Sequence, residues 1–270
     1  MSRGTTVRVA AVQMVSAPEV APNLEAAARL VAAAAAAGAR LVALPEYFCI
    51  LGRQETDKVK VREADGAGPI QDFLAAAARK NRVWLVGGTI PLVSQDENKV
   101  RNACLVFDDE GRRVARYDKI HLFGLDLADQ RFDEARTIEP GEQPVALDTP
   151  FGRIGLSVCY DLRFPELYRA AGPVDAWFAP SAFTAVTGAA HWELLVRARA
   201  VENQCYVIAP AQGGLHPNGR RTHGHSMIVD PWGEVLASRA EGEGVVLAEL
   251  NAARIAEVRQ SLPALQHRRL

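Results

Sequence analysis

The sequence lacks the features that would assign it to a membrane or nucleic-acid-binding class. Its longest apolar stretch, residues 30–37, is rich in alanine and ends at a glycine, far short of the roughly 20 residues that a membrane-spanning helix needs. Its 31 lysines and arginines are balanced by 32 aspartates and glutamates, so no basic field is available for a nucleic acid or an anionic membrane surface. We therefore expect a small-molecule partner, with no nucleic acid and no membrane.

Cysteine is scarce, and the spacing of the few cysteines excludes two kinds of site. The four of them lie far apart without a C-x-x-C pair, so neither a disulfide framework nor a zinc site is predicted. A phosphate-binding glycine loop is absent, and the pair His223 and His225 has no carboxylate or cysteine ligand at a recognised spacing. We expect free thiols, no metal and no cofactor.

The ends and the length of the chain show no sign of a leader or a boundary. Residues 5–15 alternate like a strand and lack the basic region, long apolar run and cleavage site of a secretory signal, so a cytoplasmic location is expected. No linker, charge block or repeat of 20 to 50 residues divides the sequence. We predict one domain, 1–270, with 255–270 as a C-terminal tail.

Strand-like and helix-like segments alternate along the chain. Strands are expected at 7–12, 41–44, 83–88, 102–107, 114–117, 155–158, 176–179, 205–209, 226–230 and 235–237, and helices at 23–38, 71–80, 165–171, 190–202 and near the C-terminus. Such alternation with some hairpins predicts a mixed α/β fold. Because apolar strands need cover on both faces, we expect two sheets packed together with helices outside them.

Three side chains of complementary chemistry follow predicted strands. Glu46, Lys119 and Cys159 each come at or just after the end of such a run, and strand ends are where open α/β sheets build sites. A free thiol has a pKa of about 8.5, and a carboxylate base with an ammonium can activate it without a histidine. Alone, each residue has a structural explanation: a core thiol, a helix cap or surface carboxylate, and a solvated strand-end charge.

The segments around these residues resemble the three signature motifs of the nitrilase superfamily. They are Ala-Leu-Pro-Glu-Tyr (43–47), Tyr-Asp-Lys-Ile-His-Leu (117–122) and Ser-Val-Cys-Tyr-Asp-Leu-Arg-Phe-Pro-Glu (157–166), and the segments 187–193 and 224–233 fit the same family. The chain is thus identified as a member of the superfamily over nearly its whole length. The resemblance implies a four-layer α-β-β-α sandwich that pairs through its helices into a homodimer or higher homo-oligomer.

The resemblance also implies a role for each residue of the triad. Cys159 attacks an amide carbonyl, Glu46 accepts the thiol proton and then protonates the leaving ammonia, and Lys119 stabilises the oxyanion, leaving a thioester for water. The backbone N–H of Tyr160 can donate to the same oxyanion. A cysteine–histidine protease is the less favoured interpretation, since it requires a histidine beside Cys159.

A fourth catalytic residue follows from the same comparison. Related amidases have a second glutamate in the loop after the lysine motif, and Glu134 is its counterpart here. That carboxylate would orient the substrate amide and the hydrolytic water. Because Asp133, Glu139 and Glu142 lie close to it in the sequence, an acidic surface loop is an equally supported interpretation.

The C-terminal half is most similar to the deaminated glutathione amidases and the omega-amidases, whose substrates carry carboxylates. Arg163 can clamp a carboxylate with its planar fork of donors, and Phe183 and Thr187 are further candidate contacts. An ion pair of Arg163 with Asp161 or Glu166 is the structural alternative.

We therefore expect an amidase that hydrolyses a terminal carboxamide of a small molecule to a carboxylate and ammonia. An omega-amidase acting on 2-oxoglutaramate or 2-oxosuccinamate, and a nitrilase or N-carbamoyl hydrolase, are the alternatives within the superfamily. A non-catalytic scaffold or sensor with this fold is the alternative from another class, because fold alone does not guarantee activity. The loop between His216 and His223 is expected to shape the pocket entrance.

Overall fold

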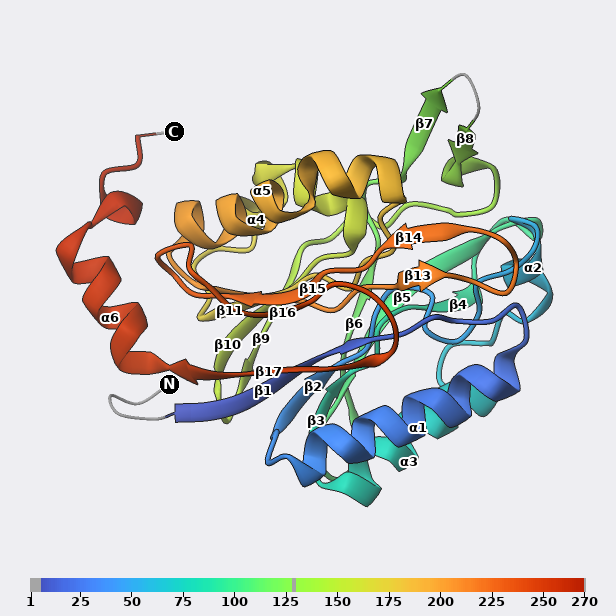
Figure 1. Cartoon of the computed structure of the whole chain (residues 1–270), viewed down its shortest axis with the longest axis horizontal. Coiled ribbons are helices and arrows are strands. Elements are labelled where there is room, and N and C mark those ends of the chain that lie inside the picture. The colour runs from blue at the N-terminus through green and yellow to red at the C-terminus, as the bar shows by residue number, and fades with distance from the viewer. Residues whose placement is uncertain (1–5, 128–129, 270) are drawn as a thin grey trace.

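The computed structural model describes residues 6–127 and 130–269, whose helices and strands form four layers (Figure 1). Two mixed β-sheets lie face to face in the middle. Helices α1 (Val20–Ala36) and α3 (Pro69–Asn81) cover the outer face of one sheet, and α4 (Pro165–Ala170) and α5 (Ala185–Asn203) cover the other. The predicted α-β-β-α sandwich is confirmed.

The first sheet has the strand order β17-β1-β2-β3-β5-β4, with β6 paired to β5. Its strands are β1 (Thr6–Gln13), β2 (Leu41–Ala43), β3 (Trp84–Val86), β4 (Ile90–Val93), β5 (Val100–Phe107), β6 (Arg113–Asp118) and β17 (Gly244–Asn251). β1 runs parallel to β2 and antiparallel to β17. The last strand of the chain therefore pairs with the first.

The second sheet has the order β16-β15-β12-β11-β10-β9. Its strands are β9 (Val145–Thr149), β10 (Gly152–Leu156), β11 (Ala176–Phe178), β12 (Tyr206–Ala209), β15 (Ser226–Val229) and β16 (Val235–Arg239). Two separate hairpins pair β7 (Gly124–Leu127) with β8 (Gln130–Asp133), and β13 (Gly213–Leu215) with β14 (Arg221–His223). Figure 1 shows both hairpins at the same end of the sandwich.

The core between the sheets is apolar and continuous. Val9 and Leu41 from the first sheet belong to the same buried cluster as Trp177 and Val207 from the second. Burial of this apolar surface is the main driving force for the association of the layers. Within the described ranges no helix has both the length and the apolar character needed to cross a membrane.

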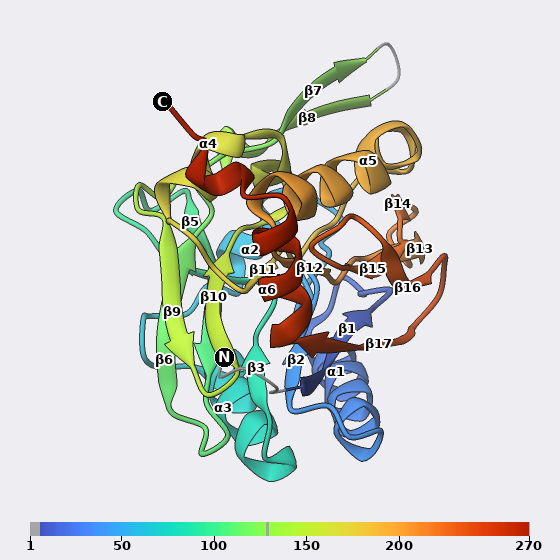
Figure 2. The same ribbon diagram turned by 90° about the vertical axis from the view of Figure 1, so that its left-hand side faces the viewer.

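Short helices complete the chain, and two of them begin at residues of the predicted site. They are α2 (Asp57–Lys60), the 3₁₀ helices η1 (Glu134–Arg136), η2 (Cys159–Arg163) and η3 (Ala264–Gln266), and the C-terminal α6 (Ala252–Ser261). The segment predicted as a tail, 255–270, thus begins within α6. Figure 2 shows α6 rising from the end of β17 toward α4 along one side of the sandwich.

Candidate active site

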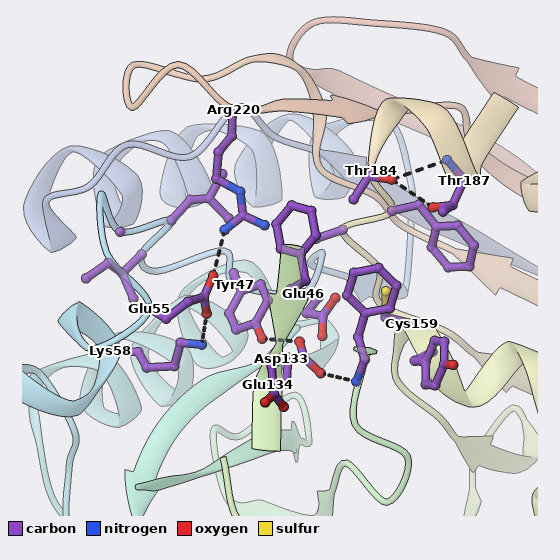
Figure 3. Close-up of a pocket in the computed structure, with 18 of the residues that line it drawn as sticks. Glu46, Tyr47, Glu55, Lys58, Asp133, Glu134, Cys159, Thr184, Thr187 and Arg220 are labelled. Atoms are coloured by element: carbon purple, nitrogen blue, oxygen red, sulfur yellow. Dashed lines mark hydrogen bonds and ion pairs between the residues drawn. The ribbon is translucent and has the colours of Figure 1, made fainter. Parts of the chain in front are cut away.

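Two residues of the predicted triad, Glu46 and Cys159, line one pocket (Figure 3). The third, Lys119, is fully buried and is hydrogen-bonded to Glu46. The Lys119 ammonium donates to Glu46 Oε1 at 2.9 Å and to Glu134 Oε2 at 2.7 Å. Cys159 lines the same pocket as Glu46, and the Glu46 charge acts on the pKa of its thiol. A sulfur, a carboxylate and an ammonium from distant parts of the sequence are therefore in one connected cluster.

Two sharp turns hold the carboxylate and the thiol in place. Glu46 follows β2 and also accepts a hydrogen bond from Asn102 Nδ2 at 3.1 Å, while the next residue, Tyr47, has a φ of 55°. Cys159 opens η2 with a φ of 50°, and its N–H donates to Pro180 O at 2.9 Å. Left-handed backbone is uncommon for residues with a side chain and is concentrated at functional sites.

Glu134 is a buried residue of this cluster and not a surface carboxylate. It begins η1 and accepts hydrogen bonds from Lys119, from the Tyr47 hydroxyl at 2.6 Å and from the Phe123 N–H at 2.8 Å. Its neighbour Glu139 instead pairs with Arg101 outside the pocket. The surface-loop interpretation does not apply to Glu134, whose catalytic role stays a prediction.

The charged groups of the cluster shift the pKa values of their neighbours. Burial works against the charge of Lys119, but Glu134 and Glu46 outweigh it and hold the pKa of the ammonium well above its usual value. Burial raises the pKa of Glu46, against the attraction of Lys119. The pKa of Cys159 is also raised, by burial and by the nearby Glu46 charge. The resting site therefore holds a neutral thiol beside a carboxylate of increased basicity.

Backbone groups near the sulfur favour its charged form. The backbone of Ala182, which lines the same pocket, lowers the pKa of Cys159 against the larger effect of burial. Tyr160, the next residue in η2, lines the pocket, and the start of a helical turn directs free N–H groups outward. These groups and Lys119 can stabilise a developing oxyanion.

Asp161 joins the lysine segment to the cysteine turn. Its carboxylate is fully buried and accepts hydrogen bonds from the Tyr117 hydroxyl at 2.6 Å, from Val158 N–H at 2.8 Å and from His121 N–H at 3.0 Å. His121 Nδ1 lies 2.7 Å from the same carboxylate. Because these donors flank Lys119 and Cys159 in the sequence, Asp161 fixes the distance between the two segments.

The predicted substrate-binding residues line one wall of the pocket. Tyr160, Arg163, Phe183 and Thr187 are all among the lining residues. The Arg163 guanidinium lies 5.6 Å from the Tyr160 ring centre and 5.5 Å from that of Phe183, and it donates toward His191 Nδ1 at 3.3 Å. No ion pair between Arg163 and Asp161 or Glu166 occurs in the described structure, and the Asp161 carboxylate is directed to other partners.

The other wall contains residues that sequence reasoning missed. Tyr47, Glu55, Lys58 and Arg220 line it (Figure 3), together with Phe132, whose ring lies beside Arg220. Tyr47 lies within the first motif and could have been recognised as a partner for Glu134. Glu55, Lys58 and Phe132 lie in short segments without an apolar pattern. Arg220 comes from the turn of the β13–β14 hairpin, within the loop that was expected to shape the entrance.

The remaining polar groups do not form a metal centre. Among residues 6–127 and 130–269, no group of three His, Cys, Asp or Glu side chains is arranged to hold a metal ion. His223 and His225 stack with ring centres 4.2 Å apart, and burial lowers the pKa of His223 to about 4. The four cysteines are free thiols.

Comparison with known proteins gives one consistent family. The carbon-nitrogen hydrolase family model matches residues 8–260. The chain is 44% identical over 265 residues to a Synechocystis sp. protein named deaminated glutathione amidase, covering 96% of this chain and 97% of that protein. The human protein of the same name is 41% identical over 270 residues, covering 97% and 82%.

Solved structures with the same fold match this chain over nearly its whole length. The C. elegans NitFhit protein superposes with a TM-score of 0.91 at 37% identity, covering 100% of this chain and 66% of that chain. Saccharomyces cerevisiae Nit3, a member of branch 10 of the nitrilase superfamily, gives 0.88 at 34% identity and covers 98% and 97%. An amidase from Nesterenkonia sp. AN1, in which acrylamide has added to the active-site cysteine, gives 0.79 at 26% identity and covers 96% and 99%.

The electrostatics of Glu46 and Cys159 predict the pH dependence of the reaction. As the pH falls through the raised pKa of Glu46, this base becomes protonated and kcat/KM is expected to decrease, so the acid limb lies above pH 4.5, the usual value for the group. No increase in kcat/KM is expected near pH 8.5, the usual pKa of a free thiol, because the pKa of Cys159 is raised well above its ordinary value. A rate profile between pH 4 and 9.5 checks both points; a limb below pH 4.5, or a rise that follows ordinary thiol ionisation, contradicts them.

Asp161→Asn is expected to destabilise the protein and slow its reaction. The amide offers fewer acceptor sites to the four donors around Asp161, so the unfolding free energy should decrease by about 2 to 4 kcal/mol, and kcat should decrease by roughly tenfold or more because the site geometry loosens. Urea unfolding and steady-state kinetics measure the two effects. Asp148→Asn, a substitution at an exposed residue of β9, should leave both unchanged; equal behaviour of the two variants would reject the role of Asp161.

Proposed function

Because the chain belongs to the carbon-nitrogen hydrolase family, we propose that it is an amidase that forms a thioester on Cys159 with a carboxylate-bearing small molecule. Membership confirms the resemblance to the nitrilase superfamily and the prediction of a hydrolase for carbon–nitrogen bonds other than peptide bonds. The observation that supports the mechanism is the connected cluster of Glu134, Lys119, Glu46 and Cys159. A non-catalytic scaffold would have no need to preserve it.

In the first half of the reaction, the sulfur attacks the amide carbonyl carbon. Glu46 takes the proton from the Cys159 thiol as the carbon–sulfur bond forms, and Lys119 and the backbone N–H groups of the cysteine turn stabilise the oxyanion. When the tetrahedral intermediate collapses, Glu46 transfers that proton to the leaving nitrogen. The carbon–nitrogen bond breaks, the amine or ammonia departs, and the acyl group stays on the sulfur.

The second half returns the enzyme to its starting state. A water molecule takes the place of the amine, Glu46 accepts a proton from it, and its oxygen attacks the thioester carbon. The carbon–sulfur bond breaks, the carboxylic acid is released, and Cys159 regains its proton from Glu46. Glu134 keeps Lys119 oriented toward the oxyanion in both halves, while Tyr47 holds Glu134.

The nature of the pocket supports a carboxylate-bearing substrate. Arg163 has no carboxylate partner among the described ion pairs, and it is held between Tyr160 and Phe183 at the pocket wall. Relatives that match over nearly the whole chain are named deaminated glutathione amidase. We therefore propose deaminated glutathione or a similar 2-oxo acid amide as the substrate. Hydrolysis of the former releases a peptide amine, whereas a terminal carboxamide releases ammonia.

An exposed apolar stripe on α5 supports self-association. Val186, Leu194 and Val201 recur along one side of this helix, and Trp232 is exposed in the turn after β15. Apolar patches of this kind mark protein interfaces. We propose that α5 packs against a second copy of the chain to form a dimer.

The four free cysteines support the further proposal of a cytoplasmic location, where thiols stay reduced.

Purified protein should hydrolyse deaminated glutathione with release of a free amine, and 2-oxoglutaramate with release of ammonia, faster than it hydrolyses aliphatic nitriles. Both products are measured beside Cys159→Ala, which should lose turnover, and beside Cys205→Ala, which removes a buried thiol outside the pocket and should retain it. Turnover of nitriles alone would reject the amidase, and no turnover of any of these compounds would favour the scaffold.

Light scattering at micromolar concentration should give about twice the 29.2 kDa mass of the chain. Leu194→Glu should shift the protein to the monomer, because it places a charge in the middle of the apolar stripe. Leu215→Glu, at an equally exposed leucine of β13, should not. A wild-type mass of 29 kDa alone would contradict the proposed dimer.

A further inference from the structure

Arg220 places a second guanidinium in the pocket, in addition to that of Arg163. It extends from the turn between β13 and β14, and in Figure 3 it lies with Glu55 on one side, while Thr184 and Thr187 lie on the other. Arg163 belongs to that other wall, because it stacks on Phe183. The two guanidiniums therefore approach the pocket from different walls.

Arg220 shares its carboxylate partner with a lysine. Glu55 is its carboxylate partner at 3.4 Å, but the same carboxylate accepts a shorter hydrogen bond, 2.7 Å, from Lys58. Lys58 is buried and also contacts the Thr137 hydroxyl, so it depends on Glu55 more than the partly exposed Arg220 does. Glu55 thus faces two cations, and its contact with Arg220 is the longer of the two and the easier to exchange for a ligand carboxylate.

Arg220 also has the geometry of a binding residue. Its guanidinium lies over the Phe132 ring, 5.2 Å from the ring centre, and such a cation–π contact does not use the N–H donors of the group. An arginine has five N–H donors in a planar fork that matches a carboxylate. The single hydrogen bond to Glu55 occupies one of the two terminal nitrogens.

We propose that Arg220 binds a second carboxylate of the substrate, located in the leaving part, while Arg163 binds the carboxylate of the acyl part. The inference rests on the proposed function. Arg163 lies in η2 together with Cys159, so it is placed for the portion that stays on the sulfur. Arg220 lies in a hairpin turn on the other wall, apart from η2, so it is placed for the portion that is released.

The lining of the pocket agrees with a substrate that reaches both walls, because Arg163 and Arg220 line the same pocket as Cys159. When a ligand carboxylate replaces Glu55 at Arg220, Glu55 keeps its bond to Lys58. No buried charge loses its partner, so the exchange has little electrostatic cost.

A structural role for Arg220 makes a different prediction. Its contacts join the β13–β14 turn to Glu55 and to Phe132 in β8, and loss of such a link would weaken the binding of every ligand alike. A carboxylate-binding role weakens only ligands that have the second carboxylate. The two roles are separated by changing the arginine and the ligand carboxylate independently.

The experiment measures the affinity of the full chain carrying Cys159→Ala, so that ligands bind without turnover. Calorimetry compares deaminated glutathione with its analogue in which the glycine carboxylate is a carboxamide, each with Arg220 and with Arg220→Met. We expect Arg220→Met to weaken the binding of deaminated glutathione about tenfold or more, as for a lost hydrogen bond to a charged group. The same substitution should weaken the binding of the amide analogue several-fold less. Arg220→Lys, which keeps the charge without the fork, should give an intermediate loss for deaminated glutathione.

Arg221→Met is the matched control, because Arg221 is the next residue of the hairpin, outside the pocket lining, and pairs with Glu241. It should bind both ligands as the parent does. Equal losses for both ligands in Arg220→Met overturn the inference while the proposed function stands, provided that the wild-type protein releases amine from deaminated glutathione. No amine release and no binding of either ligand would instead reject the proposed substrate, and the second carboxylate site with it.

Discussion

A lysine ammonium with no contact to solvent lies between two carboxylates, and the rest of the site depends on these contacts. Lys119 is fully buried, with Glu46 and Glu134 at 2.9 and 2.7 Å. A charge inside a protein is stable only where opposite charge and hydrogen bonds replace the water that it has lost. The two carboxylates do this for Lys119, and a phenol, a side-chain amide and a backbone N–H do it for the carboxylates.

The fold supports this cluster with backbone that is unfavourable on its own. Tyr47 and Cys159 both have left-handed φ angles, a strain of about 1 to 3 kcal/mol at each residue. Hydrogen bonds of their N–H groups to Thr89 and Pro180 hold these turns. Gly88 lets the chain pass Pro45, since a Cβ there would lie 2.2 Å from the Pro45 carbonyl oxygen. The position of Glu46 is thus determined by packing of segments that are distant in sequence.

The sequence predicted the parts of the site that are encoded by strand ends. Glu46 and Lys119 follow β2 and β6 of the first sheet and Cys159 follows β10 of the second, so packing of the two sheets brings these strand ends together. Their motif context then gave the family and the four layers. Helix α5 begins at Ala185 and not near residue 190, and Thr184, whose side chain accepts from the Thr187 N–H, is the N-cap signal that marks this start.

Other parts could not be predicted, because they depend on contacts between distant segments. β17 was missed: its residues are only partly buried, and its partner β1 lies at the opposite end of the chain. The β7–β8 hairpin is short and leaves the main sheets. Phe132 and Arg220 come from two such hairpins, so their meeting at one pocket wall follows from tertiary packing and from no local pattern.

The buried cluster and the pocket walls have separate parts in the reaction. The motif residues form a buried cluster whose thiol is neutral at rest, because burial and the Glu46 charge raise its pKa. Proton transfer to Glu46 must therefore accompany attack by the sulfur and cannot precede it, so the carbonyl carbon has to be held close to Cys159 when the proton moves. The buried cluster of Glu46, Lys119, Glu134 and Cys159 contains no group that recognises the rest of the substrate. That alignment has to come from the pocket walls, where Arg163 and Arg220 supply charges opposite to those of a carboxylate-bearing amide.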